Sequence, residues 1–385
     1  MAEIDGKALL RRHGLRVPRG ALLGGGAPTA AAQWPGLLLK AQLLEGGRGK
    51  RGLVRRLDTL DELVEARQVI HRALADPEVP LLLEEAIPTA REIYVAVRFD
   101  GTRPGLELLV APEGGQEIEE ARTLLRLPAD AAAPAELYPH LARLFPADLA
   151  ARLARYCARL PQILRTEDLE LLEINPLVLT PDGALVACDV KIVRDDSAEF
   201  RHDAQEFPLS RMLAERALTP LERKALALGF QLVEVEGDVV LVTSGAGLGM
   251  MMMDLLADHG LRAACFMDNL RGAPDETMAG RLAVARELAG RPAVRGIVFQ
   301  TVVASRSLAE RVNALLDWMA KEPLPKPLFV GLAAGHAATR DMSVEKALAM
   351  LGAAGIAAFI DPVAMVRAAA KALGTEGQRS AGLRP

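Results

Sequence analysis

Residues 171–191 constrain the fold of this chain more than any other stretch. Two apolar runs, residues 177–179 and 184–187, flank the sequence Thr180-Pro181-Asp182-Gly183. Proline presets a negative φ and glycine supplies a positive one, so this composition between apolar runs is typical of a tight turn. The stretch therefore predicts a β-hairpin, and its otherwise apolar strands carry Glu173, Asn175, Asp189 and Lys191.

These four polar side chains have two interpretations. Buried polar groups need partners, and a carboxylate facing an amide oxygen suits a hard cation such as Mg²⁺, together with nucleotide phosphates. Alternatively, the same side chains are exposed at the ends of the strands. The residues alone leave both interpretations open.

Composition excludes several classes of function. The 385 residues suffice for two or three domains with a large core, and a net charge of −4 argues against a nucleic-acid-binding surface. The sequence contains neither a secretory h-region nor an uncharged apolar run of membrane-spanning length. The three cysteines are widely separated, which favours reduced thiols. We therefore expect a cytoplasmic protein with no nucleic-acid and no membrane partner.

A glycine-rich loop follows the predicted strand at residues 37–42, which contains Lys40. The loop reads Glu45-Gly46-Gly47-Arg48-Gly49-Lys50-Arg51-Gly52, and a second strand is expected at residues 53–56. Backbone N–H groups of such a loop can surround phosphate oxygens while a strand lysine pairs with them. The loop is not a Walker motif, because no Gly-Lys-Ser/Thr opens a helix. A surface hairpin is the alternative.

The remaining pattern of the first half predicts an α+β domain. Helices are expected at residues 4–13, before Gly36, from a capping box at Thr59-Leu60-Asp61-Glu62, and over residues 121–167. Glu84 and Glu92 flank a segment that could contact an adenine and a ribose, although a solvated acidic edge is the commoner role of such residues. Strands are expected at residues 81–87, 91–99, 106–111 and 116–119.

The second half alternates strands with helices. A capping box with proline at the first helical position, Thr219-Pro220-Leu221-Glu222, precedes it. The alternation predicts a doubly wound parallel sheet with ligands at the carboxyl ends of the strands. Those strands are expected at residues 239–243, 263–267, 297–300, 328–332 and 356–360. The predicted domains are residues 1–210, a linker at 211–237, a second domain at 238–375 and a tail at 376–385.

Five motifs in this order resemble the β subunit of succinyl-CoA synthetase, from the ATP-grasp family of nucleoside-diphosphate-forming acid–CoA ligases. They are Lys40-Ala41-Gln42, Gly46-Gly47-Arg48-Gly49-Lys50, Arg91-Glu92-Ile93-Tyr94, Glu113-Gly114-Gly115, and Glu173-Ile174-Asn175-Pro176-Leu177 with Asp189. The resemblance implies an α/β fold, with an ATP-grasp domain followed by a flavodoxin-like domain.

The resemblance also implies roles for particular residues. It assigns Mg²⁺ to Asn175 and Asp189, and it assigns to Glu173 the alignment of a phosphohistidine carried by an α-type, CoA-binding partner subunit. It implies nucleotide contacts by Lys40, Gly47, Arg48, Gly49, Glu84, Ile87 and Glu92.

The second half departs from the family pattern at the positions implied to approach the acid. Ser244 stands where the family has asparagine, and Val303-Ala304-Ser305 stands where it has a pair of glycines. Valine and alanine prevent the closest backbone approach. A capping box starting at Ser307 still opens a helix there, and Arg306 could offset the negative charge of Glu310.

Two further departures concern neighbouring strands. Asn269-Leu270-Arg271-Gly272 replaces a glycine triplet, and an arginine usual on the fourth strand is absent near Gly331. We therefore expect a small dicarboxylic or tricarboxylic acid that need not be succinate, with Ser244, Val303, Ala304 and Ser305 near it.

These observations predict the β-type subunit of an ATP-dependent, ADP-forming acid–CoA ligase. None of the six histidines has a setting like the family's phosphohistidine, and His336 is the one candidate worth testing. The partner subunit is therefore expected to supply that residue within a hetero-oligomer. Two alternatives remain: an ATP-grasp carboxylate–amine ligase, and a non-catalytic scaffold subunit. Intact Asn175 and Asp189 argue against the scaffold, whereas the missing glycines favour it.

Overall fold

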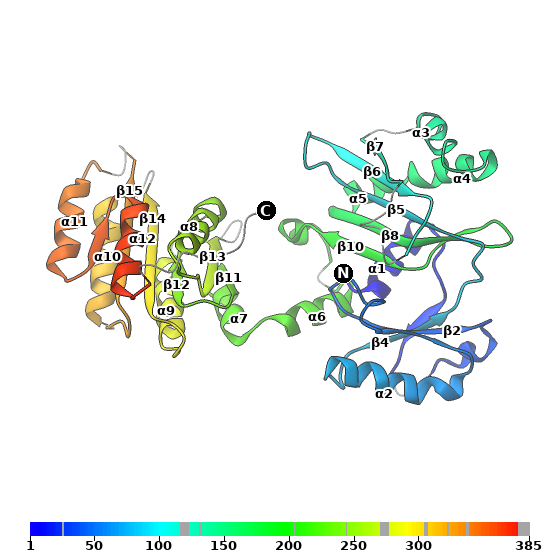
Figure 1. Ribbon diagram of the computed structural model, residues 1–385, viewed down its shortest axis with the longest axis horizontal. Helices are drawn as coiled ribbons and strands as arrows, with labels where there is room; N and C mark the ends of the chain where they lie inside the picture. The colour runs from blue at the N-terminus through cyan, green and yellow to red at the C-terminus, as the bar shows by residue number, and fades with distance from the viewer. Residues whose placement is uncertain are drawn as a thin grey trace. The chain divides into compact units, whose positions relative to one another are not determined.

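The chain forms two compact units, Met1–Ala217 and Leu218–Pro385. The computed structural model describes residues 1–24, 27–115, 123–130, 133–203, 205–243, 245–269, 277–303, 307–321, 323–335 and 339–375. Figure 1 shows unit 1 from blue to green and unit 2 from green to red. Helices and sheets are combined in both units, which confirms the predicted α/β class.

The first sheet of unit 1 is antiparallel, in the order β1-β4-β2-β3. Alternation along β2 directs Leu37 and Leu39 into a core with Ile70 of α2, and directs Lys40 to the opposite face. The elements are β1 (Gly20–Leu22), β2 (Leu37–Ala41), β3 (Val54–Leu57), β4 (Leu81–Glu85) and α2 (Leu63–Leu74).

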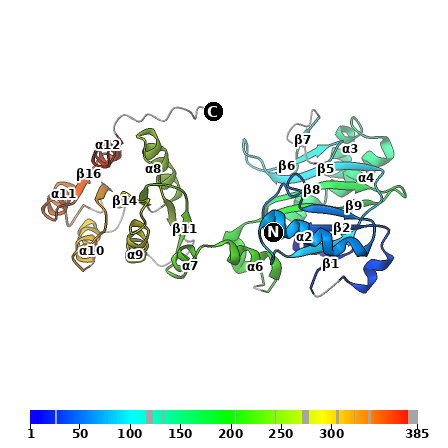
Figure 2. The ribbon, with the colours of Figure 1, turned by 60° about the horizontal axis from the view of Figure 1, so that its bottom comes forward.

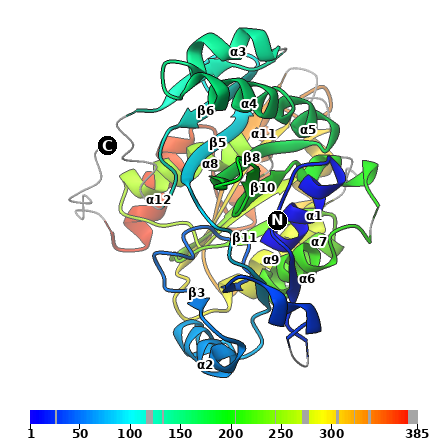
Figure 3. The same cartoon turned by 90° about the vertical axis from the view of Figure 1, so that its right-hand side faces the viewer.

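The second sheet of unit 1 is also antiparallel, in the order β10-β8-β5-β6-β7, and β9 pairs with β8. Figure 3 shows α3, α4 and α5 along one side of it. Its elements are β5 (Arg91–Phe99), β6 (Leu106–Ala111), β7 (Leu125–Pro128), α3 (Pro134–Leu141), α4 (Ala147–Cys157), α5 (Leu160–Thr166), β8 (Leu169–Leu179), β9 (Leu185–Ala187) and β10 (Val190–Arg194). The hairpin predicted from its turn is confirmed, with Gly183 at φ +86°.

Helix α1 (Glu3–Arg12) contacts both sheets, through β1 of the first and β10 of the second. Leu9 and Leu10 are fully buried on it. Its acidic first turn and basic last turn match the helix dipole. Unit 1 ends with the 3₁₀ helix η4 (Asp196–Arg201) and α6 (Pro208–Ala217).

Unit 2 contains a parallel sheet in the order β12-β14-β15-β16. Figure 2 shows α8 and α12 on one side of the strands and α9 and α10 on the other. Strand β13 lies beside β12, just after a parallel bridge between Val239 and Ala263, and it pairs antiparallel with β11. The elements are α7 (Pro220–Ala227), β11 (Phe230–Glu234), β12 (Val239–Val242), α8 (Ala246–Asp258), β13 (Cys265–Asn269), α9 (Met278–Ala289), β14 (Gly296–Val303), α10 (Leu308–Lys321), β15 (Leu328–Ala334), α11 (Val344–Ala353), β16 (Ala357–Phe359) and α12 (Pro362–Ala372).

Three local predictions are wrong. The helix expected before Gly36 is the 3₁₀ helix η1 (Thr29–Gln33), and β7 interrupts the helical stretch expected at residues 121–167. Thr59 makes no capping hydrogen bond, and the 3₁₀ helix η2 (Leu60–Glu62) precedes α2. The capping box at Thr219 is confirmed: Glu222 N donates to Thr219 Oγ1 at 3.1 Å. The strand expected at residues 116–119 lies outside the described residues.

Candidate active site

The glycine-rich loop between β2 and β3 closes through its own backbone. Leu53 N donates to Arg48 O at 3.0 Å, and Gly52 N donates to Gly49 O at 3.0 Å. Gly47 has φ +74°, and no atom lies within 4 Å of where its Cβ would be. The backbone conformation therefore requires glycine at this position, and a phosphate could approach it closely.

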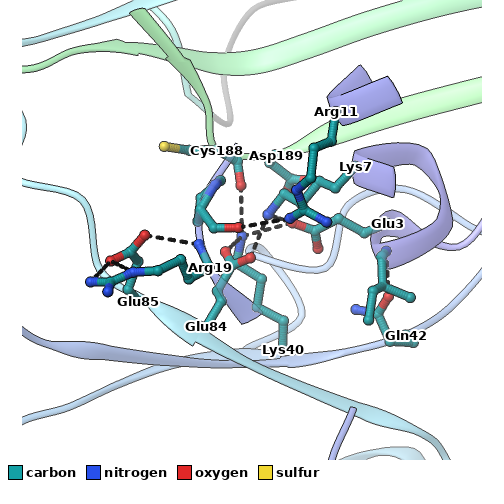
Figure 4. Close-up of polar contacts among 12 residues, drawn as sticks. Glu3, Lys7, Arg11, Arg19, Lys40, Gln42, Glu84, Glu85, Cys188 and Asp189 are labelled. Carbon is teal, nitrogen blue, oxygen red and sulfur yellow. Dashed lines mark hydrogen bonds and ion pairs between the residues drawn. The ribbon is translucent and has the colours of Figure 1, made fainter. Parts of the chain in front are cut away.

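Lys40 lies in a buried cluster of charges rather than on an open surface. Its Nζ contacts Glu3 Oε1 at 2.8 Å and Glu84 Oε1 at 2.5 Å, and it donates to Cys188 O at 2.9 Å. Lys7 of α1 contacts the same two carboxylates, at 2.6 Å and 2.5 Å. Figure 4 shows these side chains converging from α1, β2 and β4.

Arg48 extends this cluster to the second sheet. Its guanidinium contacts Glu3 Oε2 at 2.6 Å and Asp189 Oδ1 at 2.6 Å, and it donates to Ala41 O at 3.2 Å. The loop thus directs Arg48 between the two sheets. We call the three acids and three bases Glu3, Lys7, Lys40, Arg48, Glu84 and Asp189 the charge cluster.

Mutual attraction in the charge cluster outweighs the cost of burial. Burial raises the pKa of Glu3, but the positive charges of Lys40, Lys7 and Arg48 lower it by more. The pKa of Glu3 therefore lies well below its ordinary value. Burial lowers the pKa of Lys40, whereas Glu3 and Glu84 raise it above its ordinary value. The pKa of Arg48 is raised in the same way. These groups are therefore charged at neutral pH.

Asp189 is the most exposed acid of the cluster. Its side chain is 32% exposed, against 1% for Glu3. Burial and the negative charge of Glu3 raise the pKa of Asp189, so a second positive charge beside it would be favourable. Burial raises the pKa of the neighbouring Cys188 thiol to about 12, which makes this thiol a poor nucleophile.

Asn175 and Asp189, which are predicted to share a metal ion, are neighbours in the structure. Asn175 N donates to Asp189 O at 3.0 Å. The Asn175 side chain accepts from Gly115 N at 2.7 Å and donates to Gly115 O at 2.9 Å. The described residues contain no group of three His, Cys, Asp or Glu side chains arranged for a metal ion. One carboxylate and one amide oxygen fit Mg²⁺ that takes its other ligands from phosphates and water.

Glu173 points to the opposite face of β8 from Leu172 and Ile174, which pack in the core with α3, α4 and α5. It pairs in register with Lys191 of β10, and both line a cavity of about 800 Å³ with Tyr94, Arg98 and Asp195. Glu173 is not part of the charge cluster. The cavity therefore places the Glu173 carboxylate within reach of a ligand that enters over β8.

The two glutamates expected to contact the nucleotide differ in environment. Glu84 is 1% exposed within the charge cluster, whereas Glu92 is exposed on β5. Ile87 is half-buried, and its carbonyl oxygen accepts a hydrogen bond from Thr89 Oγ1 at 3.0 Å. A ligand could therefore reach Glu92 directly, but it could reach Glu84 only if the charge cluster rearranged.

Sequence reasoning did not identify Glu3 and Lys7. A glutamate followed four residues later by a lysine is usually a solvent-exposed helix pair. Here the two residues share the face of α1 that carries the fully buried Leu10. The helical spacing of Glu3, Lys7 and Leu10 was the one feature of the sequence that could have indicated that Glu3 and Lys7 are buried.

In unit 2, Val303 is 2% exposed and packs in the core, so only its backbone could meet a ligand. Half of the expected capping box is present, since Glu310 N donates to Ser307 Oγ at 3.0 Å. A Cβ on Gly331 would lie 1.8 Å from Gln300 Oε1, so any side chain at this position would require Gln300 to move. Ser244, Ala304, Ser305, Arg306 and His336 lie outside the described residues.

Several known proteins are similar to this chain in sequence and in fold. A family model described as an ATP-grasp domain matches residues 1–179. The β subunit of ADP-forming succinate–CoA ligase from Desulfurococcus amylolyticus is 31% identical over 85% of this chain and 88% of its own length. Subunit β 2 of the Streptomyces coelicolor enzyme is 32% identical over 87% of this chain and 88% of its own length.

The chain belongs to the family of succinate–CoA ligase β subunits.

A solved structure supports the same fold for this succinate–CoA ligase β-family chain. ATP citrate lyase from Methanothrix soehngenii, in complex with citrate and coenzyme A, matches with a TM-score of 0.66. It covers 97% of this chain and 99% of its own, at 18% identity, so the likeness concerns the fold alone. The predicted family is confirmed. Among the described residues, no helix is long and apolar enough to span a membrane.

Proposed function

We propose that this chain is the β-type, nucleotide-binding subunit of an ADP-forming acid–CoA ligase and that its charge cluster is the phosphate and metal site. The observation that carries the proposal is the position of Lys40, Arg48 and Asp189 beside the glycine-rich loop, where Arg48 pairs with Asp189 and Lys40 pairs with Glu84. Two of these are cations that suit phosphate oxygens, and the third is a carboxylate that suits a hard cation.

Nucleotide binding would exchange partners within the cluster. Arg48 and Asp189 neutralise each other at 2.6 Å. With Mg²⁺ and a triphosphate bound, Asp189 and Asn175 would hold the metal, and Arg48 and Lys40 would pair with the phosphates. Glu3 and Glu84 keep the lysine in place during this exchange. The bound Mg²⁺ would neutralise charge that develops on the transferred phosphoryl group.

The nucleotide would contact the loop and the linker as the resemblance implies. Backbone N–H groups at Gly47, Arg48 and Gly49 bind phosphate oxygens. The backbone at Ile87 and the carboxylate of Glu92 contact the base and ribose. Positioning of this kind contributes most of the catalysis in phosphoryl transfer.

The phosphoryl group then moves through the partner. A histidine of the α-type subunit attacks the γ-phosphorus and releases ADP, with Glu173 aligning the imidazole. The substrate carboxylate takes the phosphoryl group from that histidine and becomes an acyl phosphate. The CoA thiol, bound mainly by the partner, displaces inorganic phosphate and leaves an acyl-CoA thioester. Ser244, Val303, Ala304 and Ser305 are proposed to lie near the small dicarboxylic or tricarboxylic acid.

A non-catalytic, nucleotide-binding scaffold subunit is the second candidate. The core position of Val303 and the side chain of Gln300 over Gly331 favour it, because both differ from the expected acid site. On this proposal the charge cluster would still bind nucleotide, but acid and CoA would not stimulate ADP release.

The test is to purify the chain with its partners from the native host. The complex is then assayed for ADP release that depends on both CoA and an acid, across monocarboxylates, dicarboxylates and tricarboxylates. An α-type partner and turnover with one acid support the ligase. An α-type partner without turnover favours the scaffold. ATP turnover by the chain alone with an added amine would indicate a carboxylate–amine ligase and refute the CoA proposal.

A further inference from the structure

Unit 2 has the strand arrangement in which α/β proteins bind ligands. Strand β13 lies on one side of β12 and β14 on the other, so the strand order reverses between β12 and β14. In such sheets the ligand lies beyond the carboxyl ends of the strands, near the point of reversal. Helices α8 and α12 cover one face of this sheet and α9 and α10 the other (Figure 2).

A buried arginine occupies this end of the sheet. Arg281, in the first turns of α9, is 3% exposed. Its Nη1 donates to Thr243 O at 2.5 Å, directly after β12, and its Nη2 donates to Asn269 Oδ1 at 2.6 Å, at the end of β13. Its Nε donates to Thr277 Oγ1 at 3.2 Å, and its guanidinium stacks on the Phe230 ring.

Arg281 forms no ion pair with any described carboxylate, and its three acceptors are neutral. Burial lowers the pKa of Arg281 to about 10, the negative charge of Asp268 raises it, and the positive charge of Arg311 lowers it. The group therefore stays charged at neutral pH, and no described carboxylate is hydrogen-bonded to it. Of five N–H donors, three are used by described residues. A buried charge of this kind is stabilised by an anion.

A second unsatisfied group lies one strand away. Val242 of β12 pairs with Phe299 of β14, so Gln300 follows at the level of Thr243. Gln300 is 3% exposed, and its Oε1 has no hydrogen-bond partner among the described residues. The Gln300 amide lies over Gly331 of β15, so the carboxyl end of β14 holds a second buried polar group, on the side away from β12.

We infer that Arg281 binds a carboxylate group of the acid substrate, an assignment that rests on the function proposed above. The planar guanidinium matches the two oxygens of a carboxylate better than a lysine would. One carboxylate of the acid must remain available for phosphorylation. A second carboxylate held by Arg281 therefore makes this residue the selector for dicarboxylic and tricarboxylic acids over monocarboxylic ones.

The first experiment measures selectivity in the complete complex. KM and kcat are determined for succinate and for butyrate, which lacks the second carboxylate, in wild type, Arg281→Met and Arg281→Lys. Loss of a hydrogen-bonded charge pair should raise the KM of the dicarboxylate about 10- to 100-fold and leave the butyrate value unchanged. Arg281→Lys should recover part of the loss. If the ratio of the succinate KM to the butyrate KM is the same in Arg281→Met as in wild type, the assignment is overturned.

Arg291→Met is the matched control, because Arg291 is half exposed and already paired with Glu234. This variant should keep wild-type kinetics. The affinity of each variant for Mg-ATP, measured by calorimetry, reports on unit 1 separately and should not change. Arg281→Met with wild-type Mg-ATP affinity but altered acid selectivity isolates the effect to unit 2.

A second measurement needs neither turnover nor a folded variant. Amide hydrogen exchange of α9 is followed in the wild-type chain with succinate, citrate, butyrate or inorganic phosphate. Protection by succinate or citrate alone supports the carboxylate site, even if the complex has no ligase activity and the proposed function fails. Protection by phosphate alone, or by none of the four, overturns the carboxylate assignment.

Discussion

Replacing Glu3 with glutamine should destabilise unit 1 far more than its position near the amino terminus would indicate. Glu3 is 1% exposed and contacts Lys7, Lys40 and Arg48 at 2.6–2.8 Å. The substitution leaves one uncompensated positive charge in the charge cluster. Removing one partner of a buried ion pair costs about 3–5 kcal/mol. At roughly 2–4 °C for each kcal/mol, the Tm of a domain of this size should fall by about 6–20 °C.

The assay is urea and thermal unfolding of the full chain, compared with a matched exposed pair. Asp148 and Arg152 of α4 have the same four-residue spacing, but their side chains are 71% and 40% exposed. Asp148→Asn should cost about 0–1 kcal/mol. The double variant Glu3→Gln/Lys7→Met restores charge balance and should be more stable than the two single effects predict. Equal effects of Glu3→Gln and Asp148→Asn, or simple additivity in the double variant, would refute the reasoning.

Three further outcomes follow from the charge cluster and its surroundings. Asp189→Asn should abolish the Mg²⁺ dependence of nucleotide affinity in calorimetry while partner assembly is retained; a variant with wild-type Mg²⁺ dependence would exclude Asp189 as a ligand. The pKa of Glu3 is lowered from 4.5, so the contribution of Glu3 to stability is complete above about pH 4.5 and is lost as the pH falls further. The difference in unfolding free energy between wild type and Glu3→Gln should therefore shrink below that pH. A difference that stays constant with pH would contradict this prediction. Burial raises the thiol pKa of Cys157, Cys188 and Cys265 to about 12. An aromatic disulfide reagent at pH 8 should therefore modify these thiols at least about 10-fold more slowly in the native chain than in guanidinium. Equal rates in the two conditions would show that the thiols are accessible in the native chain.

Local patterns predicted much of the fold. The strands expected at residues 91–99 and 106–111 are β5 and β6 with the same bounds, and the Pro-Asp-Gly turn joins β8 to β9. Alternation of strands and helices also predicted the parallel sheet of unit 2. These features depend on residues close together in the chain, because periodicity sets the buried face and glycine sets the turn.

Motif reasoning brought together part of the site. The sequence placed Asn175 beside Asp189 and a glycine-rich loop after Lys40, and the structure has both neighbourhoods. It also predicted capping at Thr59, which the structure lacks because a 3₁₀ turn precedes α2. The free energy that a single capping residue contributes is small, so the packing of the helix decides where the helix begins.

The sequence by itself determined the elements, their buried faces and the residue types that phosphate and Mg²⁺ require. Only the tertiary structure decided which charges meet. Lys40 is 37 residues from Glu3, and Arg48 is 141 residues from Asp189, so no local pattern relates them. The same holds for Arg281, whose hydrogen bonds to Thr243 O and Asn269 Oδ1 form only when α9 packs over the ends of β12 and β13. The sequence does not show which partner a charged residue has or whether the residue is buried. Both are decided when distant elements pack together and exclude water.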